Sequence, residues 1–317
     1  KGADVTFIVR RHDPVCAIAF GSEAFSVLWL PAPESGRGVP SDFPDPVPHA
    51  RWAGVGWRED AADTVAAIRA FRPDWLIVDH YAFDARWHDE MRSSLDCQIM
   101  AIDDLADRAL SVDLLLDANF AEGHAQKYAG RLMRTCRHLG GPRYALLAPA
   151  YKAAPRYEFS RDVKSLGVFI GGTDPGGASA RVLQACRDEG GFSGVIEVVS
   201  TSANPHLESL QAACAADSGV QLSLDLSDLS AFYARHDLQV GAGGTATYER
   251  CCIGAPTIAL IVAANQLAVV PGLADKGVLR AARLGDDPDA DVAGVAPPLG
   301  DVVRQLVAEP DARRHRS

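Results

Sequence analysis

The sequence contains no C-x-x-C pair, no signal peptide and no apolar run long enough to span a membrane. Its seven cysteines are an odd number, and two of them, Cys251 and Cys252, are adjacent. This pattern predicts neither a disulfide framework nor a zinc site. We expect a cytoplasmic protein, because free cysteines are typical of a reducing compartment. Cys251 and Cys252 are expected to be small apolar residues of a buried helix.

The chain also lacks a surplus of basic residues, with 31 Lys and Arg against 41 Asp and Glu. A net charge of -10 argues against a nucleic-acid surface, which needs a basic patch. An anionic ligand stays compatible with this charge, because a local site can be positive in an acidic protein. We therefore expect a small-molecule partner, with no nucleic acid and no membrane.

Nothing in the composition indicates disorder, since 48% of the residues are hydrophobic and 23% are charged. A length of 317 residues suggests two domains. The acidic charge and two self-sufficient domains are compatible with a monomer. The first residue is Lys1 rather than Met, and KGADVTFIVR reads as a helix end running into a strand. We expect further residues upstream.

Short apolar runs alternate with helix-like segments such as residues 60–71, 177–187 and 207–216. This alternation predicts parallel sheets with crossover helices in two α/β domains. A stretch with three prolines, GPRYALLAPAYKAAPRY (141–157), places the boundary between domains 1–148 and 149–317. The predicted strands are residues 4–9, 25–30, 75–79, 98–102 and 113–116, and then 166–170, 195–199, 220–224, 238–241 and 257–262.

One of these strands runs into a glycine cluster, GAGGTATYERCCIGAP (241–256). Ligands of open α/β sheets bind at the carboxyl ends of strands, and a helix start there offers free N–H groups and partial positive charge. Gly243 and Gly244 would let a phosphate approach the backbone, and Thr245 and Thr247 would add hydroxyl groups. The alternative is a tight strand-to-helix turn without a ligand.

The cluster matches neither G-x-G-x-x-G nor a Walker loop, so NAD and ATP lose support and no cofactor is expected. Glu249 follows Thr245 by one helical turn. A carboxylate beside a phosphate site suits the two hydroxyls of a ribose, although an exposed helix glutamate is the simpler alternative.

A second glycine turn follows another predicted strand, in VFIGGTDPGG (168–177). Gly171, Gly172 and Thr173 repeat the Gly-Gly-Thr order, so the two turns could hold one ligand from two sides. Asp174 is expected to be a helix cap or turn residue.

Several unusual stretches then resemble one family, the UDP-2,4-diacetamido-2,4,6-trideoxy-β-L-altropyranose hydrolases of pseudaminic acid biosynthesis. That family is more distantly similar to the N-acetylglucosaminyltransferase that makes lipid II. The stretches are VDHYAFDARW (78–87), IDDLADR (102–108), DLLLDANF (113–120), GPRYALL (141–147), FIGGTDP (169–175), GAGGTATYERCCIGAP (241–256) and ANQ (264–266).

The resemblance implies a GT-B fold, in which two Rossmann-like domains face each other across a cleft. It places UDP mainly on the C-terminal domain, and it implies Tyr81 and Asn265 as catalytic residues that orient the sugar. The implied UDP-binding residues are Gly171, Gly172, Thr173, Leu226 near the uracil, Gly243, Gly244, Thr245, Thr247, Glu249 on the ribose, and Gln266.

Simpler roles stay open for several of these positions. Tyr81 could cap the sheet edge, and Asn265 could be a turn residue. His80 is expected to stabilise its own loop. Asp103 and Asp104 follow a predicted strand and could do acid–base work, but hydrogen bonds that organise the loop are the favoured interpretation.

The sequence departs from the family at its start. The family begins with a strand and a Gly-x-Gly-His loop that carries its proposed catalytic histidine, followed downstream by an arginine. This segment is absent, and His12 does not match it. We therefore expect the first strand of the N-terminal domain to be missing from this sequence.

The implied function is a metal-independent, inverting hydrolase that cleaves a UDP-linked diacetamido-trideoxyhexose to UDP and free sugar. The resemblance sets this step in pseudaminic acid biosynthesis, which serves flagellin glycosylation. Two alternatives stay open: a GT-B glycosyltransferase with a UDP-sugar donor, and a nucleotide-sugar-binding pseudoenzyme without the N-terminal histidine.

Overall fold

The computed structural model describes residues 2–12, 25–33, 47–285 and 296–313, without the side chains of residues 264 and 265. The chain forms two compact units. The first contains Lys1–Asn119 and Gly123–Tyr144, and the second contains Phe120–Glu122 and Ala145–Ser317. The predicted boundary followed residue 148, whereas this division follows Tyr144.

A three-residue excursion, Phe120–Glu122, belongs to the second unit although the first unit surrounds it in sequence. The backbone N–H of Phe120 donates to the hydroxyl of Tyr248 at 2.9 Å. The Phe120 ring also covers Gly272, where an added Cβ would lie 2.6 Å from Cε1. These contacts explain the excursion, which the sequence did not indicate.

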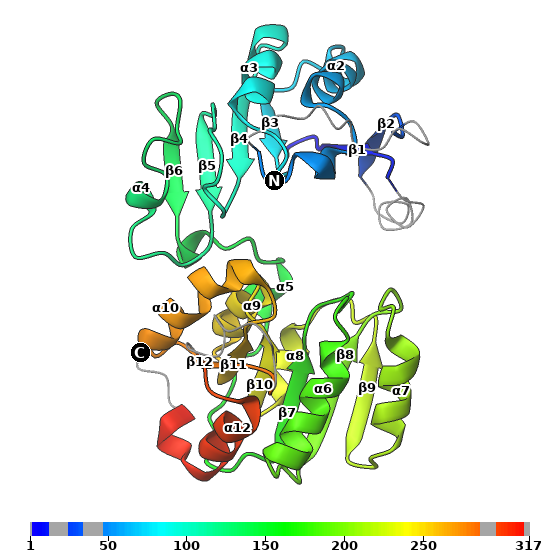
Figure 1. The fold of residues 1–317 in the computed structure, drawn as a ribbon, viewed down its shortest axis with the longest axis vertical. Helices are drawn as coiled ribbons and strands as arrows, with labels where there is room; N and C mark the ends of the chain where they lie inside the picture. The colour runs from blue at the N-terminus through cyan, green and yellow to red at the C-terminus, as the bar shows by residue number, and fades with distance from the viewer. Residues whose placement is uncertain (1, 13–24, 34–46, 286–295, 314–317) are drawn as a thin grey trace. The chain divides into compact units, whose positions relative to one another are not determined.

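The described residues of the first unit form six strands in two parallel sheets (Figure 1). One sheet pairs β1 with β2, and the other has the order β3-β4-β5-β6. The elements are β1 (Thr6–Arg10), β2 (Ser26–Leu30), η1 (Ala50–Ala53), α2 (Trp57–Ile68), β3 (Trp75–Val78), α3 (Ala85–Ser94), β4 (Gln98–Ile102), β5 (Leu114–Asp117), α4 (His124–Lys127), β6 (Arg137–Gly140) and η2 (Pro142–Tyr144).

Both sheets of the first unit share one hydrophobic core. Ile8 of β1 and Leu28 of β2 pack against the cluster that contains Leu76 and Val78 of β3. Among the described residues, no strand ladder joins β1 to β3. On β3, Ile77 is 59% exposed.

The second unit contains one continuous parallel sheet in the order β12-β11-β10-β7-β8-β9 (Figure 1). Its core includes Leu166 and Val168 of β7, Val198 of β8 and Val240 of β10, all almost completely buried. The elements are α5 (Ala150–Ala153), β7 (Ser165–Phe169), α6 (Ala178–Gln184), the π-helical turn η3 (Ala185–Glu189), β8 (Val195–Ser200), α7 (Leu207–Ala215), β9 (Val220–Leu224), α8 (Ser230–Arg235), β10 (Leu238–Ala242), α9 (Ala246–Ile253), β11 (Thr257–Leu260), η4 (Ala264–Ala268), α10 (Val270–Asp275), β12 (Arg280–Ala282), α12 (Leu299–Ala308) and η5 (Pro310–Arg313).

All ten predicted strands are present; two have the predicted bounds and the others shift by one or two residues. Two further strands, β6 and β12, were missed. The β6 sequence, RHLG, has little apolar character, and β12 has only three residues, RAA. Since all strands within a sheet are parallel, their carboxyl ends gather the loops of each unit at a single edge.

Candidate functional site at the strand ends

The two Gly-Gly-Thr turns of the second unit lie next to each other. They follow β7 and β10, which are neighbouring strands in register at Phe169 and Gly241. Gly171 has φ +125, a conformation that favours glycine, and an added Cβ there would meet nothing within 4 Å. Gly244 is exposed and equally open. This edge therefore presents uncovered backbone at two adjacent points.

Gly243 has a different role from the one predicted. It is buried, and an added Cβ would lie 2.2 Å from Cγ2 of Val270. Its N–H donates to the carbonyl of Leu260 at 2.9 Å. The close approach that requires glycine here is to the protein itself, so Gly243 shapes the turn and Gly244 presents its open backbone.

Helix α9 begins directly after this turn, with the exposed Thr245 as its N-cap residue. The first N–H groups of a helix have no acceptor within that helix, so they are available to an anion. Thr247 has a different role from the predicted one. Its side chain is 1% exposed, its hydroxyl contacts the Ala242 carbonyl at 3.4 Å, and it accepts from Arg250 at 3.1 Å. Its hydroxyl stabilises the turn, so Thr247 is not among the proposed ligand contacts.

Glu249 is half-buried and held by two tyrosines. The hydroxyl of Tyr233 donates to Oε2 at 3.3 Å. Burial, followed by the charge of Glu249 and a hydrogen bond to it, raises the pKa of Tyr151 above its ordinary value. Both tyrosines are almost fully buried, so they fix the orientation of this carboxylate.

The remaining predicted residues of this unit lie at the same edge. Gln266, in η4 after β11, is 9% exposed, and its Oε1 accepts from the N–H of Val262 at 2.8 Å. Leu226 follows β9 and is partly exposed. The Asn265 side chain lies outside the described residues, while its backbone belongs to η4.

The loop after β7 is organised by two contacts. The hydroxyl of Thr201, at the end of β8, donates to the carbonyl of Gly172 at 2.6 Å, and Thr173 is exposed. Asp174 is buried, and its carboxylate accepts from the N–H groups of Ala178 and Ser179, both at 2.8 Å. The predicted cap role of Asp174 is confirmed.

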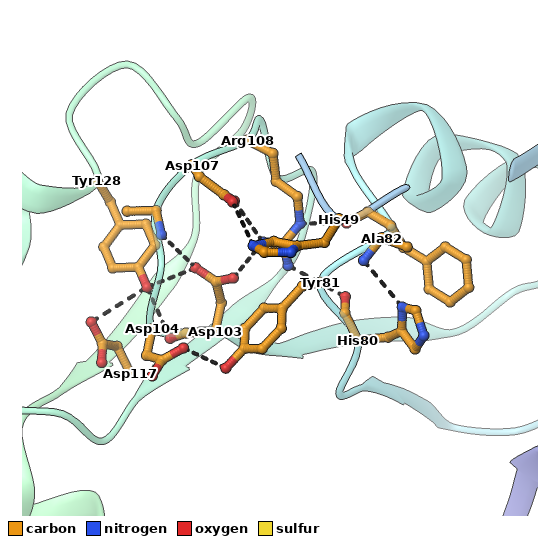
Figure 2. A network of polar contacts seen from close by, with 12 residues as sticks. His49, His80, Tyr81, Ala82, Asp103, Asp104, Asp107, Arg108, Asp117 and Tyr128 are labelled. Carbon is orange, nitrogen blue, oxygen red and sulfur yellow. Dashed lines mark hydrogen bonds and ion pairs between the residues drawn. The ribbon is translucent and has the colours of Figure 1, made fainter. Parts of the chain in front are cut away.

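In the first unit, the ends of β3, β4 and β5 carry a polar network (Figure 2). The hydroxyl of Tyr81, after β3, donates to Asp104 at 2.5 Å. The side-chain amide of Asn119, after β5, donates to the other oxygen of Asp104 at 2.6 Å. Asp104 follows β4, so one carboxylate joins the ends of three neighbouring strands.

Burial raises the pKa of Tyr81 above its ordinary value, and the hydrogen bond and charge of Asp104 raise it further. Burial also raises the pKa of Asp104, with the hydrogen bond from Tyr81 opposing that rise. Tyr81 is thus a protonated donor fixed on a carboxylate. The Tyr81 ring packs beside His49 and Trp52, with centroid distances of 5.8 and 5.9 Å.

Asp103 has a structural role, as favoured from the sequence. It is 2% exposed. Its oxygens accept from the N–H of Ala106 at 3.0 Å and from the hydroxyl of Tyr128 at 2.9 Å, and Arg108 lies 2.6 Å away (Figure 2). The ring of His80 accepts from the N–H of Ala82 at 3.1 Å, which stabilises its own loop as expected.

Several residues at the strand ends of both units were not predicted from the sequence. Asp117, at the end of β5, is fully buried and paired with Lys127 at 2.6 Å. The signal was present, because Asp117 directly follows the predicted strand 113–116 inside the stretch DLLLDANF (113–120). Tyr151 and Arg250 carried no such signal. Cys251 was expected to be buried but is exposed.

Among the described residues, no group of three or more His, Cys, Asp or Glu side chains could hold a metal ion. No helix in the same residues is long and apolar enough to cross a membrane.

Two α/β units with parallel sheets define the class of this fold, the two-domain Rossmann-like GT-B fold. UGT89C1 of Arabidopsis thaliana complexed with UDP-L-rhamnose superposes with a TM-score of 0.58 at 13% identity, over 100% of this chain and 84% of that one. The S. aureus MnaA-UDP structure superposes with a TM-score of 0.56 at 11% identity, over 97% of this chain and 89% of that one. Acinetobacter baumannii MurG superposes with a TM-score of 0.50 at 10% identity, over 97% of this chain and 92% of that one. At these identities the likeness shows the fold alone.

One curated relative is the spore coat polysaccharide biosynthesis protein SpsG of Bacillus subtilis (strain 168). It is 24% identical over 222 residues, which are 69% of this chain and 65% of that protein. The match thus spans about two thirds of the relative's length. No protein-family model matches the chain.

Proposed function

We propose that this protein is a nucleotide-sugar enzyme whose second unit binds UDP at the paired Gly-Gly-Thr turns. The observation that carries the proposal is the open backbone at Gly171 and Gly244, on neighbouring strand ends. Glycine turns at a helix start suit a diphosphate. GT-B neighbours were solved with UDP or a UDP-sugar, which supports the choice of nucleotide.

In the proposed complex, the diphosphate contacts the N–H groups at residues 244–246 and the hydroxyls of Thr173 and Thr245. Glu249, fixed by its tyrosines, accepts from the ribose hydroxyls. Leu226 borders the uracil, and Asn265 and Gln266 border the sugar and phosphates. Each hydrogen bond to a charged oxygen contributes roughly 1.5–3 kcal/mol.

The finer proposal is hydrolysis of a UDP-linked diacetamido-trideoxyhexose, as in pseudaminic acid biosynthesis. Water attacks the anomeric carbon with inversion, the bond from that carbon to the diphosphate oxygen breaks, and UDP leaves. The start of α9 stabilises the charge that develops on the leaving oxygen. The Tyr81 hydroxyl, fixed by Asp104, orients the sugar. The spore-coat relative supports a role in polysaccharide biosynthesis.

The test is to incubate the full-length protein with the UDP-sugar in EDTA and to follow products by NMR and ion-exchange chromatography. We expect UDP and free sugar, and the sugar as first released should have the inverted anomeric configuration. Release of UDP only after magnesium is added would contradict metal independence.

A glycosyltransferase of the same fold is the second candidate, since a structural neighbour has been solved both with UDP-L-rhamnose and with quercetin. It would bind UDP in the same way but pass the sugar to an acceptor hydroxyl. A product formed only with an acceptor would favour this function. UDP affinity without turnover in either assay would instead indicate a nucleotide-sugar-binding pseudoenzyme.

A further inference from the structure

Arg250 is a charged side chain buried directly behind the β10–α9 turn. It is 0% exposed. Its Nη2 donates to the carbonyl of Ala242 at 2.9 Å and to the hydroxyl of Thr247 at 3.1 Å. Both acceptors border the glycine turn, so the guanidinium lies at the carboxyl end of β10.

The chain makes room for this group. An added Cβ at Gly241 would lie 2.3 Å from Nη1 of Arg250 and 2.6 Å from the carbonyl oxygen of Phe169. Gly241 and Phe169 are the paired ends of β10 and β7. The guanidinium therefore lies beneath the point where the two Gly-Gly-Thr turns begin.

The charge of Arg250 is not neutralised by the described residues. Its Nε and Nη1 have no hydrogen-bond partner there, and no ion pair with a described carboxylate forms within 4.0 Å. The hydroxyl of Tyr233 interacts with both Glu249 and Arg250, but it is a neutral group and supplies no counter-charge. Arginine stays charged when buried, and a buried charge without a counter-charge is unfavourable.

We propose that Arg250 is the buried cation that makes this turn selective for a diphosphate, with the ligand supplying its missing counter-charge. The inference deepens the proposed function, on which its site rests. Arg250 acts through the field at the turn and through the Ala242 carbonyl, so it is a positioning residue. Because the charge is shielded from solvent, its effect should persist at high salt.

The test measures dissociation constants of UDP, uridine and inorganic pyrophosphate by calorimetry, in the full-length wild type and in Arg250→Met. We expect UDP and pyrophosphate to bind about tenfold more weakly to the variant. Uridine, which lacks the diphosphate, should change less than about twofold. Arg250→Lys, which keeps the charge, should recover part of the loss.

Arg313→Met is the matched control. Arg313 is also a buried arginine of the second unit, with Nε and Nη1 unpartnered in the described structure. It donates to the carbonyl of Arg161, before β7 begins, and so lies at the opposite edge of the sheet. This variant should keep the wild-type ratio of UDP to uridine affinity.

The outcomes separate the two proposals. Equal losses for UDP and uridine in Arg250→Met, or no loss, overturn the role of Arg250 alone. A wild type that binds pyrophosphate but not UDP overturns the proposed function alone, and one that binds neither overturns both. If Arg250→Met does not fold, wild-type pyrophosphate affinity between about 0.1 and 0.5 M salt decides: a loss above about 100-fold indicates exposed cations and overturns the inference.

Discussion

The second unit presents uncovered glycine turns, a helix start and a buried arginine at the carboxyl edge of its sheet. At the corresponding edge of the first unit lie carboxylates, tyrosines and an asparagine. Both edges belong to parallel sheets. Uncovered backbone N–H groups suit an anion, whereas the first unit's edge offers hydroxyl, amide and carboxylate groups.

A second difference lies in the sheets themselves. Within the described parts of the chain, the second unit has one continuous six-stranded sheet, whereas the strands of the first unit divide into a pair and a group of four. Doubly wound sheets bind ligands where the strand order reverses. In the second unit the order reverses between β10 and β7, the two strands that the Gly-Gly-Thr turns follow.

The largest effect is expected from removing the anion-edge contacts. Thr245→Val combined with Glu249→Ala should weaken UDP binding at least about 100-fold, because two hydrogen-bonding groups are lost. Calorimetry measures this. Glu309→Ala, a carboxylate at the end of α12, is the control. Unchanged UDP affinity in the double variant would place the nucleotide elsewhere.

Buried ion clusters allow the stability of the two units to be compared. Glu197 of β8 accepts from Arg235 at 2.9 Å and from His236 at 2.8 Å, and Asp60 of the first unit pairs with Arg10 at 2.9 Å. Glu197→Gln and Asp60→Asn should each lower the free energy of unfolding by about 3–5 kcal/mol, because a buried charge loses its partner.

Urea unfolding measures these losses. Asp301→Asn, in an exposed pair with Arg304, should lose less than about 1 kcal/mol. A similar loss in all three variants would mean that burial does not set the strength of these clusters.

Acid should act on the second unit through Glu197. Although burial alone raises it, hydrogen bonds from His236, Arg235 and Ser223 lower the pKa of Glu197 to about 2. The unfolded value is higher, near 4.5. The stabilisation is therefore present above the unfolded pKa and is lost as the pH falls towards 2. Wild type should lose more stability than Glu197→Gln on acidification through this range, and parallel losses would contradict the assignment.

A smaller effect is expected at the polar edge of the first unit. Tyr81→Phe should lower kcat for sugar release about 10- to 100-fold, since it removes one orienting hydrogen bond, while the Kd of UDP stays within about twofold. Asp104→Asn should follow the same pattern, because Asp104 fixes Tyr81. Steady-state kinetics and calorimetry separate the two readouts. A loss of UDP affinity equal to the loss of kcat would contradict the proposal that Tyr81 orients the sugar and does not bind UDP.

The smallest effects distinguish two adjacent glycines. Gly243→Ala should lower the free energy of unfolding by about 1–3 kcal/mol, because its Cβ meets Val270. Gly244→Ala should leave stability within about 0.5 kcal/mol but weaken UDP binding, since its Cβ projects into open space where the diphosphate is proposed. Thermal unfolding with and without UDP tests both, and the reverse pattern would exchange their roles.

Local patterns in the sequence determined the alternating strands, the two α/β units and the two Gly-Gly-Thr turns. They did so because strand periodicity and glycine clusters depend on neighbouring residues only. The same patterns located Tyr81, Asp104 and Glu249 at strand ends or in the following helix turn.

Only the tertiary structure decided what each of these residues contacts. It buried Gly243 and Thr247 and left Gly244 open. It also put Arg250 behind the turn and moved Phe120–Glu122 into the second unit. The physical reason is that burial and charge pairing arise from segments far apart in sequence, such as β7, β10 and α9, and no local spacing encodes which side of a turn faces the solvent.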